Sequence, residues 1–103
     1  MFEWDEDKNE VNIIKHGIGF RRASKIFDGL TLDWEDTRKN YGEVRTISVG
    51  LLKEDDIATI TVVHTDREDI KRIISARPAN RKEKRLYEVY QRTIRQGAGE
   101  PEG

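Results

Sequence analysis

The densest group of basic side chains in the sequence lies in residues 71–85, which hold seven Lys or Arg residues and one acid. Within this group, the pattern predicts that Arg77 ends a strand and that Arg81 begins a helix. The Arg77 guanidinium and the free N–H groups of the helix start could then bind one phosphate. Arginine is also the side chain best shaped for bidentate contact with phosphate. We therefore predict that Arg77 and Arg81 are catalytic and stabilise a phosphate. The alternatives are a surface salt bridge for Arg77 and a solvated helix face for Arg81.

His16 and its neighbour Lys15 are the candidates for proton transfer. Histidine exchanges protons near neutral pH, which suits a general acid or base. Against this, a histidine in the last turn of a helix can simply satisfy free carbonyl groups. The second histidine, His64, falls within an apolar strand, where a hydrogen-bonded core residue is the better prediction.

Further contacts to a polyanion are predicted around these residues. Strict alternation along a strand at 70–77 places Lys71 and Ser75 on the side of the sheet that carries Arg77. Ile73 falls on that side too. A polar face beside a basic helix start can hold a phosphodiester chain. The predicted contacts to an RNA chain are Arg45, Lys71, Ser75, Lys84 and Arg85.

Nothing in the sequence predicts a metal ion or an organic cofactor. There is no cysteine, and the two histidines stand 48 positions apart without carboxylates at ligand spacing. The sequence contains neither a glycine-rich phosphate loop nor a nucleophile elbow. It is compatible with metal-free chemistry, in which a base, an acid and nearby cations act on a phosphodiester.

The spacing of apolar residues predicts the elements that position these residues, with a helical period in some segments and a period of two in others. A short strand at 2–4 precedes a helix that Asp5 caps and Gly17 ends, and a second short helix covers about 18–29. Period-two alternation then predicts strands at 30–36, 44–52, 57–65 and 70–77, with a polar turn at 53–56 among their connections. A last helix starts at Asn80, and Glu83 completes its capping box. We expect its apolar stripe to be buried, and that stripe consists of Leu86, Val89, Tyr90 and Ile94.

This order, β-α-α-β-β-β-β-α, predicts an α+β fold with a small antiparallel β-sheet and helices packed mainly on one face. We predict a single domain over residues 1–95 and a disordered polar tail over 96–103. No apolar run approaches the roughly 18 residues of a membrane span, and no signal peptide opens the sequence, so a cytoplasmic protein is expected. The net charge is only −1, but five acids in residues 1–10 and seven bases in 71–85 separate the charge into two regions.

Four blocks of the sequence, in order, resemble the BrnT family of toxins from bacterial type II BrnT–BrnA toxin–antitoxin systems. They are FEWDEDKNEVNIIKHGIGFRRASKIFD, GEVRTISVG, VVHTDRED and RIISARPANRKEKRLYE, and they span most of residues 2–90. The resemblance implies a RelE-like fold, ribonuclease activity, and arrest of translation and growth. It also implies a BrnA-like ribbon-helix-helix antitoxin that represses the operon, so that operator DNA is contacted only through the antitoxin. Because such antitoxin halves pair as dimers, a 2:2 heterotetramer is expected.

A non-catalytic module is the alternative interpretation of the same residues. The basic region 71–85 could bind an acidic protein or a nucleic acid without cleaving it. The charge pattern fits both functions equally well, and only the family resemblance separates them. A small ribbon-helix-helix protein encoded directly downstream would favour the toxin, and its absence would favour the binding module.

Overall fold

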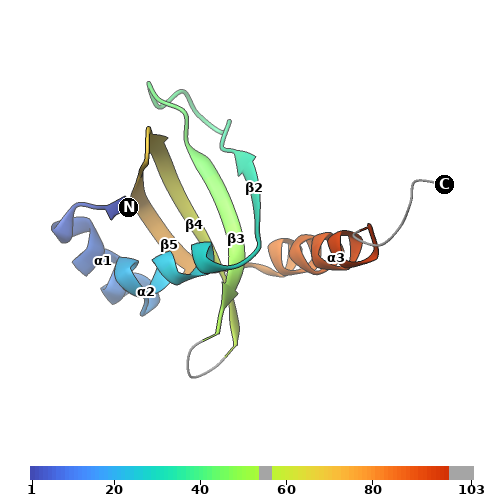
Figure 1. The fold of residues 1–103 in the computed structure, drawn as a ribbon. Coiled ribbons are helices and arrows are strands. Elements are labelled where there is room, and N and C mark those ends of the chain that lie inside the picture. Colours follow the sequence, from blue (N-terminus) through green and yellow to red (C-terminus); the bar gives the residue numbers. More distant parts are fainter. Residues whose placement is uncertain (54–56, 98–103) are drawn as a thin grey trace.

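The computed structural model describes residues 1–53 and 57–97 (Figure 1). Its elements are β1 (Phe2–Glu3), α1 (Glu6–His16), α2 (Phe20–Ala23), the short 3-10 helix η1 (Ser24–Asp28), β2 (Thr31–Glu35), β3 (Thr46–Leu52), β4 (Ala58–Arg67), β5 (Ile70–Pro78) and α3 (Arg81–Gly97). The predicted α+β class and order of elements are confirmed. α3 continues two residues past the domain boundary predicted at residue 95. The rest of the predicted tail, and most of the turn predicted at 53–56, lie outside the described residues. No helix in the described ranges is long and apolar enough to cross a membrane.

The five strands form one mixed sheet in the order β1-β5-β4-β3-β2 (Figure 1). Strands β2 to β5 pair antiparallel with their neighbours, as their short connections predict. β1 instead runs parallel to β5, with Phe2 opposite Lys71 and Glu3 opposite Arg72. The sequence does not predict this parallel edge, because a two-residue strand has too few side chains to reveal its pairing direction.

A β-bulge in β5 makes part of the predicted division between the two sheet faces wrong. In the pairing with β4 the register shifts, and Ile74 is left without a partner. The extra residue turns Ile73 into the core beside Ala76 and brings Lys71 to that same face. Neither Ile73 nor Lys71 therefore shares a face with Arg77. Strict alternation cannot foresee such an insertion.

The main core lies between this face of the sheet and the segment formed by α1, α2 and η1. Phe20 and Ile26 are almost completely buried there. Gly50 of β3 permits the close approach of η1, because a Cβ at this position would lie only 2.9 Å from the Ile26 Cβ. Burial of apolar surface is the main force that holds the two layers together. The core residues are Ile18, Phe20, Ala23, Ile26, Leu52, Ile60, Val62, Ile73 and Ala76.

Asn12 attaches α1 to the edge of β5 beyond the end of β1. Its side-chain amide donates to the backbone oxygens of Ile18 and Ala76 at 2.9 and 2.7 Å. Its side-chain oxygen accepts from the N–H of Ala76 at 3.2 Å. The buried Asn12 thus replaces a neighbouring strand, which keeps the end of α1 close to β5. As predicted, Asp5 caps α1 and Gly17 ends it with a positive φ of 71°.

α3 begins on the opposite face of the sheet, where one turn anchors it. Asn80 and Glu83 form the predicted capping box, with N–H to side-chain distances of 2.8 and 2.9 Å. Tyr87 is buried in a small cluster with Val49 and Ala79. Its hydroxyl also donates to the backbone oxygen of Leu30 at 2.7 Å. Beyond this anchor, the helix projects away from the sheet (Figure 1).

The predicted burial of the α3 stripe is wrong for most of its length. Leu86, Val89 and Ile94 are 43%, 44% and 43% exposed. The helix passes the edge of the sheet after its first turns, so Leu86 is only partly covered and the body of the protein offers Val89 and Ile94 no surface to pack on. Apolar periodicity shows which side of a helix is apolar, but not what covers it.

Candidate nucleic-acid interface

Arg77 lies near the end of β5 and forms a bidentate ion pair with Glu83 in the first turn of α3. Its Nη1 and Nη2 donate to the two carboxylate oxygens, both at 2.8 Å. The buried carboxylate also accepts from the Thr61 hydroxyl and the Asn80 N–H, both at 2.9 Å. These donors, Arg77 foremost, lower the pKa of Glu83 to about 2, although burial opposes the shift. Glu83 is therefore ionised at neutral pH and supplies negative charge to the basic helix start.

The Arg77–Glu83 pair lines a groove of about 360 Å³ between the sheet and α3. Arg38 and Lys82 add two further cations to its wall, and Trp34 adds an aromatic ring. Grooves that bind single-stranded nucleic acid usually combine two features. Cations contact the phosphates, and an aromatic ring beside them stacks on a base. We call this hollow the Arg77 groove.

Arg38 is fixed at this groove by the loop that follows β2. Its Nε and Nη2 donate to the two oxygens of Asp36 at 2.8 and 2.7 Å, and the Tyr41 hydroxyl donates to the same carboxylate at 3.0 Å. The hydrogen bonds from Arg38 hold the pKa of the buried Asp36 well below its usual range. The paired guanidinium still has a side chain that is 68% exposed, so it can accept a further anionic partner.

The predicted proton-transfer residues line a second groove, of about 310 Å³, between α1 and β5. Lys15 and His16 reach it from the last turn of α1, and Ser75 reaches it from β5. The attachment of α1 through Asn12 accounts for this proximity. The structure therefore brings Lys15, His16 and Ser75 together as neighbours of one hollow, which we call the His16 groove.

Strand β5 contributes a side chain to each groove, Ser75 to the His16 groove and Arg77 to the Arg77 groove. Ser75 and Arg77 are two residues apart in a stretch of regular pairing with β4, so both side chains stand on the same face, roughly 7 Å apart along the strand. An extended chain that crosses β5 could contact both.

The remaining predicted cations are divided between the surroundings of the grooves and the far face. Arg81, Lys84 and Arg85 are exposed in the first turns of α3, and none forms an ion pair with another described residue. Arg45 lies beside the loop that holds Arg38, with its guanidinium 4.0 Å from the centre of the Tyr41 ring. These four could contact a polyanion that extends beyond the Arg77 groove.

The predicted place of Lys71 beside Arg77 is wrong. Its Nζ lies 5.1 Å from the centre of the Phe27 ring and 3.1 Å from a carboxylate oxygen of Asp66. Phe27 belongs to η1, on the side of the sheet opposite the Arg77 groove. The bulge in β5 is the cause of this displacement.

His64 is the buried, hydrogen-bonded core residue that its position predicts. Its Nε2 lies 2.8 Å from the Ser48 hydroxyl and its Nδ1 lies 2.7 Å from Asp66. This arrangement resembles a Ser-His-Asp triad. Ser48, however, is completely buried and its hydroxyl contacts Asp33 at 2.5 Å, so it cannot reach a substrate. Burial lowers the pKa of His64, and the network serves to hold the strands together.

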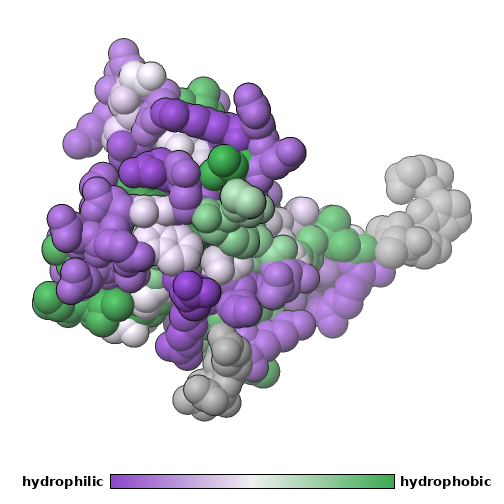
Figure 2. Space-filling view, turned by 60° about the vertical axis from the view of Figure 1, so that its left-hand side comes forward, coloured by the Kyte–Doolittle hydropathy of each residue, from purple (hydrophilic) through white to green (hydrophobic). Residues whose placement is uncertain are grey.

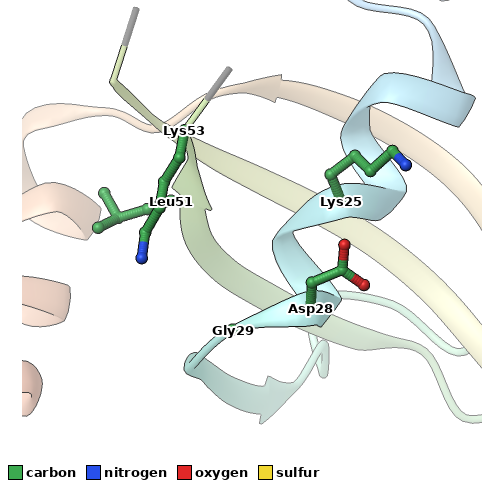
Figure 3. Close-up of a pocket in the computed structure, with 5 residues that line it drawn as sticks. All are labelled: Lys25, Asp28, Gly29, Leu51 and Lys53. Carbon is green, nitrogen blue, oxygen red and sulfur yellow. The ribbon is translucent and has the colours of Figure 1, made fainter.

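The described residues contain no group of three His, Asp or Glu side chains placed to hold a metal ion. A further hollow of about 380 Å³ lies between η1 and the end of β3 (Figure 3). Lys25 and Asp28 border it from η1, and Leu51 and Lys53 border it from the other side. It contains none of the residues predicted to act on a polyanion, and its charge is mixed.

Sequence reasoning missed several members of the Arg77 groove. Trp34 reads as an ordinary sheet residue, and nothing in the sequence distinguishes Lys82 from its basic neighbours. The Asp-x-Arg spacing of Asp36 and Arg38, directly after a strand, is a signal that could have indicated a fixed guanidinium. Glu83 reads as a capping residue, and nothing in its local pattern reveals that it also binds Arg77.

Comparisons with known proteins agree with this architecture. Residues 4–83 match the family model described as the ribonuclease toxin BrnT of type II toxin–antitoxin systems. The fold is similar to the 1.1 Å crystal structure of the Brucella abortus ribonuclease toxin BrnT, with a TM-score of 0.57 and 25% sequence identity. That match covers 79% of this chain and 99% of the Brucella chain. A search of curated proteins gave no match.

Proposed function

Because the chain belongs to the BrnT family of ribonuclease toxins from type II toxin–antitoxin systems, we propose that it cleaves RNA in the Arg77 groove and thereby arrests translation and growth. The observation that carries this proposal is the groove itself, which combines Arg77, Arg38 and Lys82 with the Trp34 ring. RNA offers a phosphate for the cations and a base for the ring.

The proposed reaction is attack of an RNA 2′-oxygen on the adjacent phosphorus. A base removes the 2′-OH proton, the bond to the 5′-oxygen breaks, and an acid protonates the leaving oxygen. The products are a 2′,3′-cyclic phosphate and a 5′-hydroxyl. Cations that bind the phosphate oxygens stabilise the extra negative charge of the transition state, and we assign this role to Arg77, with Arg81 beside it.

The proton transfers are assigned to the His16 groove, whose residue Ser75 lies two positions from Arg77 on β5. His16 is the proposed acid or base, with Lys15 beside it. Glu83 is a poor base because its pKa is about 2, so its role is to hold Arg77 in place. Ser75, Arg45, Lys84 and Arg85 are proposed RNA contacts around the two grooves, whereas Lys71 is not, because it lies on the other face.

The chemistry needs no metal ion, because the nucleophile belongs to the RNA and the charge is balanced by arginine and lysine. The test is to incubate the purified protein with an RNA oligonucleotide in the presence and absence of EDTA, and to identify the new ends. We expect cleavage in both cases and a cyclic phosphate. Loss of cleavage in EDTA that a divalent ion restores would contradict the mechanism.

The proposed partner is a BrnA-like ribbon-helix-helix antitoxin in the cytoplasm, in a complex of two toxins and two antitoxins. Acidic antitoxin side chains over the basic start of α3 would occupy the surface that RNA needs. Charge reversal at Arg81, Lys84 and Arg85 tests this idea through RNA cleavage and antitoxin affinity. If cleavage is lost while antitoxin affinity is unchanged, the two ligands do not share this surface.

A non-catalytic binding module remains the second candidate function. The ion pair between Arg77 and Glu83 favours this function, because the Glu83 carboxylate neutralises Arg77, the best phosphate ligand in the groove. Such a module would bind the RNA oligonucleotide and leave it intact. The cleavage assay above therefore separates the two functions.

A further inference from the structure

The projecting part of α3 carries an apolar stripe. Leu86, Val89 and Ile94 are each more than two-fifths exposed, and Tyr90 is half-buried. At 100° per residue these four side chains fall within an arc of about 140° on one side of the helix. Figure 2 shows hydrophobic residues along one side of this helix and hydrophilic residues along the other. Apolar side chains at these spacings are the pattern by which one helix docks on another surface.

The charge around the stripe determines what can cover it. Residues 81–97 hold six Lys or Arg residues and two acids. One of the acids, Glu83, is already bound to Arg77. At 100° per residue, Lys82 falls within the apolar arc and Arg85 and Arg92 fall beside one edge of it, whereas the other acid, Glu88, falls on the opposite side of the helix. Two copies of α3 side by side would therefore bring like charges together. A helix with acidic residues beside its own apolar stripe would instead be complementary in both charge and hydrophobicity.

We propose that this stripe binds an acidic amphipathic helix of a partner protein. The identification of that partner as the antitoxin rests on the proposed function. Leu86 belongs both to the stripe and to the wall of the Arg77 groove, where Lys82 lies beside it. A helix docked on the stripe thus lies at the mouth of the groove and obstructs RNA.

The test uses the absence of cysteine from the chain. V89C introduces a single thiol into the stripe, and I14C introduces one on α1, where Ile14 is 84% exposed, as the matched control. Both are exposed positions, so neither substitution opens a cavity. The rate of thiol modification by a maleimide is measured for each variant alone and in complex with the antitoxin encoded beside the toxin gene. We expect complex formation to slow the thiol modification of V89C at least tenfold and to leave the modification rate of I14C unchanged.

Four other results would each overturn the proposal in a distinguishable way. A tight complex in which V89C reacts at its free rate contradicts the docking site alone. Failure to obtain any complex contradicts the proposed toxin–antitoxin function as well. If thiol modification of V89C in the free toxin becomes slower as the toxin concentration rises, a second copy of the toxin covers the stripe. Slowing by an RNA oligonucleotide without antitoxin indicates that the stripe belongs to the RNA site.

Discussion

Arg77 and Glu83 depend on each other, and this changes what a substitution at either position is expected to do. Arg77 would be a freely replaceable surface residue if it only ended a strand. Instead it binds the carboxylate of Glu83, a residue that is only 8% exposed. Removal of one partner of such a pair leaves the other charge buried without its counter-ion, which costs more than the pair itself contributes.

The first prediction concerns Arg77→Ala. Loss of a phosphate ligand should reduce RNA cleavage on the order of 10²-fold, by comparison with the loss of one oxyanion donor. The same change should reduce the free energy of unfolding by about 1–2 kcal/mol, since Arg77 remains partly solvated and Glu83 keeps two other donors. Cleavage rates and urea unfolding curves of the two proteins measure both effects.

Two control variants separate the catalytic effect from the structural one. Arg77→Lys keeps a positive charge but cannot make the bidentate contact. The double variant R77A/E83Q removes the unpaired charge and should recover part of the stability without recovering cleavage. A folded Arg77→Ala protein that cleaves RNA at the parental rate would remove Arg77 from the mechanism.

The second prediction concerns pH. The folded-state pKa of Glu83 is about 2, below its ordinary value of 4.5, so its contribution to stability is fully present above pH 4.5 and is lost as the pH falls toward 2. We expect the wild-type protein to lose more stability than E83Q between pH 6 and pH 3 in urea unfolding. Asp36 also has a lowered pKa, so D36N serves as a comparison. Equal losses in the wild type and E83Q would show that the ion pair does not stabilise the fold.

At the scale of elements, α3 is held by its first turns and not by its length. Tyr87 packs against Val49 and Ala79 and donates to Leu30, whereas Val89 lies beyond the sheet. The third prediction follows from this contrast. Tyr87→Ala should cost about 3–5 kcal/mol because it removes a buried aromatic ring, and Val89→Ala should cost less than about 0.5 kcal/mol. Thermal melting of the two variants tests this, and a large effect of Val89→Ala would mean that the stripe is covered within the chain.

Much of the element order is readable from the sequence because local signals agree. Asp5, Gly17 and the Asn80–Glu83 capping box mark helix ends through hydrogen bonds between near neighbours. Alternation of apolar and polar residues marks the strands, and it too depends only on near neighbours in the sequence. The parallel pairing of β1 and the bulge at Ile74 depend on partners far away in the chain, and no local pattern contains them.

The candidate site can be only partly predicted from the sequence, because several of its residues come together from distant parts of the chain. The basic composition of residues 71–85 points to Arg77, but alternation wrongly adds Lys71 because it ignores the bulge. Trp34 and Arg38 reach the groove through the sheet and the loop after β2, so their contribution appears only in three dimensions. His16 and Ser75 are 59 positions apart in the sequence and meet because Asn12 fixes α1 to β5.

At the scale of the whole molecule, the separation of charge matters more than the net charge of −1. The fourth prediction is that RNA affinity falls steeply with salt although the protein is nearly neutral. The three groove cations alone would give a slope of log K against log salt of about −2 for single-stranded RNA, and the proposed contacts at Arg45, Arg81, Lys84 and Arg85 would make the slope steeper. Fluorescence anisotropy at several salt concentrations measures it, and an affinity independent of salt would mean that phosphates are not the ligand of the groove.

The central claim is that the RNA's own 2′-oxygen is the nucleophile and that the protein supplies the charge and the proton transfers. The most direct measurement compares an RNA oligonucleotide with the same sequence carrying 2′-O-methyl groups, at saturating protein and in EDTA. Both should bind, since both present phosphates to Arg77, Arg38 and Lys82. Only the unmodified RNA should be cleaved, with a 2′,3′-cyclic phosphate at the new end. Cleavage of the methylated strand, or binding of both strands without any cleavage, would contradict the proposed mechanism.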